Sequence, residues 1–105
     1  MAWVRIANVN EVPEGTGKTF TINNHQIAVF QVEGQFYALD DTCSHAEASL
    51  GEGEVDVEER CVECPLHGSL FDLATGQPRT LPAYEPVPTY PVRIEEGMII
   101  VEYSS

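Results

Sequence analysis

Four residues of the sequence have side chains that could together hold a metal ion or an iron–sulfur cluster. Cys43 and His45 are separated by one residue, and Cys64 and His67 are separated by two. Each pair supplies one thiolate and one imidazole, and the two pairs lie too far apart in sequence to share one local turn. We therefore expect two loops of the fold to meet and to form a single site with four ligands.

Two kinds of site use two thiolates and two imidazoles. One is a tetrahedral zinc site, and the other is a [2Fe–2S] cluster with mixed ligation. Zinc ligands usually stand about two to four residues apart within each pair, whereas a single residue separates Cys43 from His45. The spacing favours the iron–sulfur cluster, and zinc stays the alternative.

The composition narrows the range of partners. A chain of 105 residues suits one domain. Its 17 acidic and 5 basic residues give a formal net charge of −12. Such a surface repels phosphates and anionic lipids, so we expect neither nucleic acid nor a membrane as a partner. The charge favours docking onto a basic protein surface.

The first residues and the cysteines indicate the compartment. The sequence begins with a strand-like pattern that does not resemble a signal peptide. No apolar run approaches the roughly 20 residues that span a bilayer. Three cysteines without a secretory leader do not suggest a disulfide framework. We therefore expect a cytoplasmic protein whose thiols stay reduced.

Short runs of β-forming residues alternate with turn residues along the chain. We expect strands at residues 3–7, 18–22, 25–32, 35–39, 54–58, 60–63, 69–73, 90–95 and 98–103. The proline-rich residues 77–91 predict an extended loop, and residues 47–50 allow a short helical turn. This pattern is typical of an all-β protein, an antiparallel sandwich or barrel.

The motifs resemble those of a known family. Its marks here are C-x-H at residues 43–45 and C-P-x-H-G at residues 64–68, followed by Phe71-Asp72, Thr75-Gly76 and Tyr90-Pro91-Val92. The chain resembles Rieske-type [2Fe–2S] ferredoxins, the electron carriers of bacterial ring-hydroxylating oxygenase systems. The resemblance implies a single Rieske domain over residues 1–105, with a small cluster-binding subdomain at about residues 41–82 inserted into a basal β domain.

The resemblance also implies how one cluster would be bound and what it would do. Cys43 and Cys64 would bind one iron, and His45 and His67 the other. The protein would carry single electrons from an NAD(P)H-dependent flavoprotein reductase to a terminal oxygenase, and it would not itself be an enzyme. The alternative is an integral small subunit of a reductase such as assimilatory nitrite reductase. A cluster-free interaction module is disfavoured because all four ligands are present.

Residues near the ligands bear on the reduction potential. High-potential relatives have a disulfide across the cluster, and the matching positions here are Ala48 and Leu66. Ser69 matches a serine that donates to a sulfide in those proteins. Phe71 stands where they have a tyrosine that donates to a cysteine sulfur. The resemblance therefore implies a potential at the low end of the family range.

Two further residues could be mistaken for ligands. Cys61 and Cys64 form a C-x-x-C motif, but in a strand their side chains would point to opposite faces. We therefore expect Cys61 to be buried and inert. His25 lies in a predicted strand far from either pair in sequence, and we interpret it as a strand residue. The gap between His45 and Cys64 is longer than the resemblance leads us to expect, with the excess near residues 56–60.

Overall fold

The computed structural model describes residues 2–43, 48–66, 68–81 and 85–103. Within these residues every paired strand is antiparallel, as predicted for an all-β fold. None of the helices found there is long and apolar enough to cross a bilayer. The elements are β1 (Ala2–Asn8), η1 (Val9–Glu11), β2 (Thr16–Ile22), β3 (His25–Val32), β4 (Gln35–Asp40), η2 (Leu50–Glu52), β5 (Glu54–Asp56), β6 (Cys61–Glu63), β7 (Leu70–Asp72), β8 (Thr89–Tyr90), β9 (Val92–Glu95) and β10 (Met98–Tyr103).

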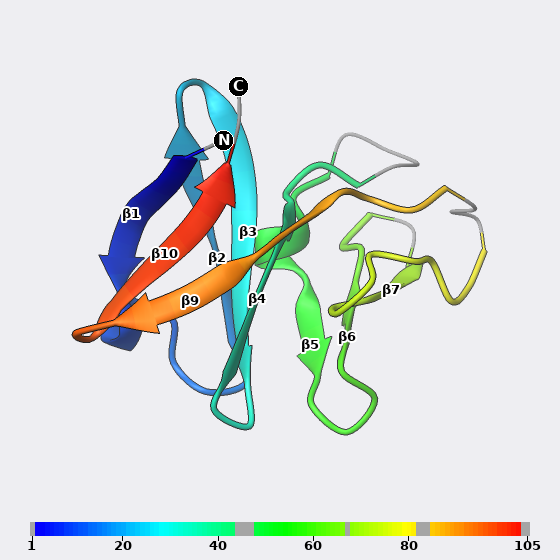
Figure 1. Cartoon of the computed structure of the whole chain (residues 1–105). Coiled ribbons are helices and arrows are strands. Elements are labelled where there is room, and N and C mark those ends of the chain that lie inside the picture. Colours follow the sequence, from blue (N-terminus) through cyan, green and yellow to red (C-terminus); the bar gives the residue numbers. More distant parts are fainter. Residues whose placement is uncertain (1, 44–47, 67, 82–84, 104–105) are drawn as a thin grey trace.

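The strands form three sheets. The outer sheet has the order β1-β10-β9, the central sheet β2-β3-β4-β8, and the small sheet β5-β6-β7. Figure 1 shows the outer sheet on one side of the central sheet and the small sheet on the other. The small sheet is built from the residues between β4 and β8, so it is an excursion from the central sheet.

Strand β3 explains why the central sheet is covered on both faces. It holds the apolar run Ile27-Ala28-Val29-Phe30, all fully buried. Ile27 and Val29 pack with residues of the outer sheet, whereas Ala28 and Phe30 pack with residues of the small sheet. Because successive side chains of a strand point to opposite faces, one strand links two hydrophobic cores.

A glycine makes room for the largest side chain of this strand. Gly17 in β2 pairs with Phe30 in β3. A Cβ atom at Gly17 would stand 2.4 Å from the Phe30 ring, so any larger residue there would displace the ring from the core.

Three hairpin turns agree with the sequence prediction. Asn23 and Asn24 join β2 to β3 with φ of 50° and 67°. Glu33-Gly34 and Glu96-Gly97 join β3 to β4 and β9 to β10, also with positive φ at both residues. Positive φ at both central residues gives a turn whose twist matches that of the flanking strands.

The prediction of one strand over residues 90–95 was wrong. Tyr90 ends β8, which pairs with β4 of the central sheet, and Val92 begins β9, which pairs with β10 of the outer sheet. Pro91 lies between them, and its missing N–H allows the chain to leave one sheet for the other. Strand β8 also lies inside the segment predicted to be loop, where it forms an edge of the central sheet.

The short helices differ from the prediction as well. Helix η1 at Val9–Glu11 was not predicted. The helical turn predicted over residues 47–50 corresponds to η2 at Leu50–Glu52, and residue 47 lies outside the described residues. Both helices are single 3₁₀ turns, which are too short to show a helical periodicity in sequence.

Candidate metal centre

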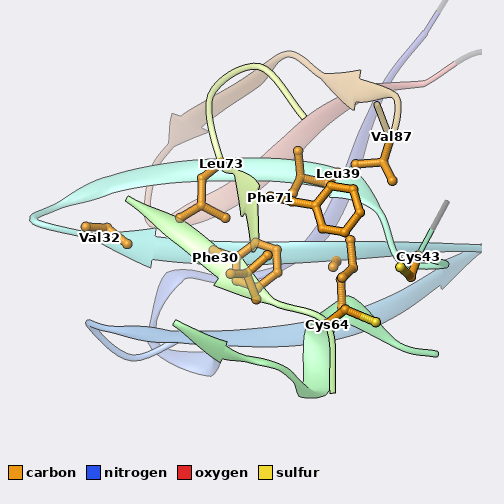
Figure 2. Close-up of a cluster of buried hydrophobic side chains, with 11 residues drawn as sticks. Phe30, Val32, Leu39, Cys43, Cys64, Phe71, Leu73 and Val87 are labelled. Atoms are coloured by element: carbon orange, nitrogen blue, oxygen red, sulfur yellow. The ribbon is translucent and has the colours of Figure 1, made fainter. Parts of the chain in front are cut away.

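The structure brings the two predicted cysteine ligands into one buried cluster of side chains. Cys43 is 4% exposed and Cys64 is fully buried, and both pack in the core between the central and small sheets. Figure 2 shows them among the other members of this core. His45 and His67 lie outside the described residues. The structure therefore places two of the four expected ligands, the two cysteines.

Backbone hydrogen bonds close the first loop, residues 43–48, at its base. The N–H of Cys43 donates to the carbonyl oxygen of Ala48 at 3.0 Å, and the N–H of Leu50 donates to that of Asp41 at 2.7 Å. Thr42 and Ser49 form a β-bridge between these bonds. The base of the loop is thus a short two-stranded neck, with Cys43 at its end and His45 within the loop that it closes.

The second loop, residues 64–69, is closed in the same way. The N–H of Cys64 donates to the carbonyl oxygen of Ser69 at 2.7 Å, and the N–H of Gly68 donates to that of Cys64 at 2.9 Å. Gly68 has φ of +77°, a value that glycine adopts without steric cost. Because Glu63 and Leu70 pair in β6 and β7, this loop is the turn of a hairpin, and His67 belongs to it.

The side chains around the cysteines are apolar. Leu39, Phe71, Leu73 and Val87 are at most 3% exposed and belong to the same core as Cys64. Such packing excludes water and lowers the local dielectric constant, two factors that set the potential of a bound cluster. Two soft sulfur ligands at the bases of two adjacent loops fit an iron–sulfur cluster.

Cys61 lies on the other side of β6 from Val62 and Cys64. It is fully buried, yet it is absent from the core that contains Val62 and Cys64. Burial raises the pKa of its thiol, while the charge of Arg79 opposes that rise. No disulfide joins Cys43, Cys61 and Cys64. The prediction that Cys61 is buried is confirmed, and its absence from the core of Cys64 agrees with a side chain on the opposite face.

His25 has partners of its own outside the cysteine core. Its Nε2 lies 2.6 Å from Asp40 Oδ1 and 3.1 Å from the Tyr90 hydroxyl, which in turn donates to Asp40 Oδ1 at 2.5 Å. Burial and the nearby Asp40 carboxylate raise the pKa of Tyr90. The interpretation of His25 as a satisfied strand residue is confirmed. The sequence did not predict its contact with Tyr90 in β8.

Residues 77–79 form a strap that is hydrogen-bonded to β7, one strand of the hairpin that carries the second loop. The N–H of Asp72 donates to the Gln77 carbonyl at 2.9 Å, and the N–H of Arg79 donates to the Leu70 carbonyl at 2.6 Å. Arg79 Nη2 also donates to Asp72 Oδ2 at 2.6 Å. Burial would raise the pKa of Asp72, but Arg79 and the N–H groups of Thr75 and Ala74 outweigh it and lower that pKa. These bonds, with an isolated β-bridge between Phe71 and Pro78, hold part of the predicted loop beside β7.

The hairpin at residues 56–60, where the sequence predicted excess length, contacts the central sheet. Arg60, at its end, donates to the Tyr37 hydroxyl at 3.0 Å and forms an ion pair with Glu33. Tyr37 lies in β4, and Glu33 lies in the turn that precedes it. Through Arg60, this hairpin thus connects the small sheet to the central sheet.

Sequence reasoning overlooked two residues that support the site, Arg79 and Asp41. Arg79 is one of only 5 basic residues among 17 acidic ones, so it could have been singled out as a structural ion-pair partner. Asp41 lies two residues before Cys43 of the first motif, but nothing in the sequence distinguished it from the neighbouring acidic residues. The described residues, which include only two of the four expected ligands, hold no group of three or more His, Cys, Asp or Glu side chains suited to a metal.

Comparison with known proteins identifies the family. The profile of the Rieske [2Fe–2S] domain matches residues 2–91. The 3-phenylpropionate/cinnamic acid dioxygenase ferredoxin subunit of Escherichia coli strain K12 is 45% identical over 94 residues, which cover 90% of this chain and 87% of that protein.

Solved structures agree with this match. The ferredoxin of carbazole 1,9a-dioxygenase from Nocardioides aromaticivorans IC177 superposes with a TM-score of 0.91 at 35% identity, over 96% of this chain and 97% of that one. A chain in the complex of reduced oxygenase and oxidised ferredoxin in carbazole 1,9a-dioxygenase has a TM-score of 0.86 at 35% identity, over 94% and 91% of the two chains. Because the profile spans most of the sequence and these ferredoxins match it over nearly their whole length, the chain belongs to the Rieske [2Fe–2S] domain family.

Proposed function

We propose that this protein is the ferredoxin of a ring-hydroxylating oxygenase system. It would accept single electrons from an NAD(P)H-dependent flavoprotein reductase and pass them to a terminal oxygenase. The observation that carries this proposal is the burial of Cys43 and Cys64 in one core at the bases of two adjacent loops. The relatives named as ferredoxins of dioxygenases support it, one of them in complex with its oxygenase.

The ligand set follows from the motifs. Cys43 and Cys64 would hold one iron as thiolates, and His45 and His67 would hold the other through neutral imidazoles. When bound, the cluster supplies a site that takes up and releases one electron. Family membership favours this cofactor over the zinc alternative. We propose that residues 41–82 act together as the cluster-binding subdomain.

The chain's own residues hold and insulate the site. The backbone hydrogen bonds at the base of each loop would hold the two cysteines in place and so limit the rearrangement that accompanies electron transfer. Phe71, Leu73 and Val87 keep water from the sulfur side. The relatives named as ferredoxin subunits of dioxygenases support a carrier and not an enzyme.

Charge would govern docking to both partners. A net charge of −12 attracts basic protein surfaces and speeds encounter at low salt. Weak, transient complexes of this kind let one surface meet the reductase and the oxygenase in turn. We also propose a cytoplasmic location, because the three cysteines are without disulfides and a reducing compartment keeps thiols in that state.

The test combines spectroscopy with electron-transfer kinetics. The reduced protein should give an EPR signal of a Rieske cluster, with an average g-value below that of clusters with four cysteines. Electron transfer to a terminal oxygenase should slow by about tenfold or more as salt rises from low to physiological and higher concentrations. An integral reductase subunit would instead remain in a stoichiometric complex at high salt, an outcome that would overturn the shuttle.

A further inference from the structure

We propose that Asp41 is a positioning residue of the first loop, and that its buried charge lowers the reduction potential of the bound cluster. Asp41 is only 2% exposed, although it carries a carboxylate in a protein with an excess of negative charge. This inference rests on the proposed function, because it assumes that Cys43 is a cluster ligand.

Three donors converge on one oxygen of this carboxylate. Asp41 Oδ1 accepts hydrogen bonds from the Thr19 hydroxyl at 2.8 Å, the Ser49 hydroxyl at 2.9 Å and the Gly51 N–H at 2.9 Å. The hydroxyl oxygens of Thr19 and Ser49 are themselves 3.1 Å apart. A buried carboxylate with three such bonds has the partners that its burial requires.

These donors come from the segment that returns from the first loop and from the central sheet. Thr19 lies in β2 of the central sheet, whereas Ser49 and Gly51 lie on the segment that returns from the loop. The backbone of Asp41 adds a bond from its N–H to the Gln26 carbonyl at 3.1 Å. The side chain of Asp41 therefore ties the neck that carries Cys43 to β2, and its backbone ties the neck to β3.

The packing around Asp41 requires glycine at position 51. A Cβ atom on Gly51 would lie 2.2 Å from Thr19 Oγ1 and 2.9 Å from Asp41 Oδ1. A side chain there would separate the carboxylate from its donors. The close approach of this backbone to Asp41 shows that the neck is built around the carboxylate.

The charge of Asp41 acts over a short distance. Two residues of extended chain span at most about 7 Å between the Cα atoms of Asp41 and Cys43. All three donors to the carboxylate are neutral groups, so they do not cancel its charge. Charges interact more strongly in a protein interior than in water. Adding an electron to a nearby cluster is therefore less favourable than it would be beside a neutral residue.

The substitution Asp41→Asn separates charge from hydrogen bonding, because an amide oxygen still accepts the three bonds. We expect the purified holoprotein of this variant to keep its iron, sulfide and EPR signal. Its equilibrium should shift about tenfold toward the reduced form, which corresponds to about 59 mV for one electron. The matched control is Glu52→Gln, which removes the same charge from an exposed side chain beside the same neck and should shift the potential far less.

Two more variants test positioning. Asp41→Ala removes charge and acceptor together, and we expect it to lose most of its iron and sulfide. Ser49→Ala keeps the charge and removes one donor, so it should release iron about fivefold faster than wild type, with no rise in potential. Since Ser49→Ala is a mild change, it keeps the proposal testable if Asp41→Ala does not fold.

The results test the role of the charge, the positioning role and the proposed function separately. Equal potentials for Asp41→Asn and Glu52→Gln would overturn the role of the charge. Wild-type iron retention in both Asp41→Ala and Ser49→Ala would overturn the positioning role. A wild-type protein without a Rieske EPR signal would instead refute the proposed function, so the two failures are distinguishable.

Discussion

Cys43 and Cys64 pack in one buried core although they follow strands of different sheets, β4 of the central sheet and β6 of the small sheet. Each cysteine donates its backbone N–H across the base of its own loop, to Ala48 and to Ser69. The backbone thus presents two sulfur atoms from two independent hairpins. This relationship makes the cysteines testable as a pair, with Cys61 as an internal control.

Replacing either ligand cysteine by serine should remove the cluster. Cys43→Ser and Cys64→Ser should lower iron from about two atoms per chain to nearly none, because a hydroxyl is a poor ligand for a [2Fe–2S] iron. Cys61→Ser should retain iron and the visible spectrum, since this thiol faces away from Cys64 and burial raises its pKa. Iron and sulfide analysis measures the cluster content of each variant. A colourless Cys61→Ser protein would contradict the prediction that Cys61 is not a ligand.

The potential should rise when Phe71 is replaced by tyrosine. Phe71 is fully buried in the core that holds both cysteines, and it matches a tyrosine that donates to sulfur in high-potential relatives. One added hydrogen bond, at about 0.5–1.5 kcal/mol, corresponds to roughly 20–65 mV for one electron. We expect a wild-type midpoint potential below zero and a higher one for Phe71→Tyr.

The matched control for this change is Phe36→Tyr. Phe36 packs against the other core, between the central and outer sheets, so an added hydroxyl there should leave the potential unchanged. Redox titration followed by visible absorption measures all three proteins. A wild-type potential well above zero, or an equal shift in both variants, would contradict the prediction.

Acid should weaken the strap through Asp72. Its pKa lies below the ordinary value of about 3.9 because the Arg79 and backbone hydrogen bonds outweigh the effect of burial. The stabilisation is therefore complete above that ordinary value and is lost as pH falls through the lower pKa of the folded state. Asp72→Asn should lower the free energy of unfolding by about 1 kcal/mol at pH 7 and should make it less dependent on pH in acid.

Glu59→Gln is the control for the strap. Glu59 also faces Arg79, at 3.5 Å, but its side chain is 69% exposed, so water screens the pair. Urea unfolding at neutral and acid pH should show little effect of this change. The role of Asp72 would be refuted if both variants had the same acid dependence.

Tyr90 should ionise above the ordinary range for tyrosine. Burial and the Asp40 carboxylate raise its pKa above the usual value of about 10. The neutral hydroxyl stabilises the fold below about pH 10, and that contribution is lost as pH rises toward the higher pKa of the folded state. An alkaline titration of phenolate absorbance should show a late component, absent in Tyr90→Phe and kept in Tyr37→Phe. Complete titration of the wild type near pH 10 would speak against this contact.

The β-structure near the turns was predictable because its determinants are local. Asn23-Asn24, Glu33-Gly34 and Glu96-Gly97 each include Asn or Gly, which tolerate positive φ, between β-forming runs, and each forms the expected hairpin. The sequence also shows Pro91, but the effect of this proline on the chain depends on which strands pair on either side of it. Whether the chain continues in one sheet or changes sheets is decided by long-range pairing, which a local pattern does not encode.

The sequence by itself determined the chemistry of the centre, because ligand types and their spacing lie within two short motifs. It also indicated that Cys61 faces away from Cys64, since alternation along a strand is local. Only the tertiary structure decided that Asp41, Thr19 and Gly51 meet beneath the first loop and that Arg79 holds the strap on Asp72. These contacts join residues from different strands and loops, and their energy depends on burial, which exists only once the sheets have packed.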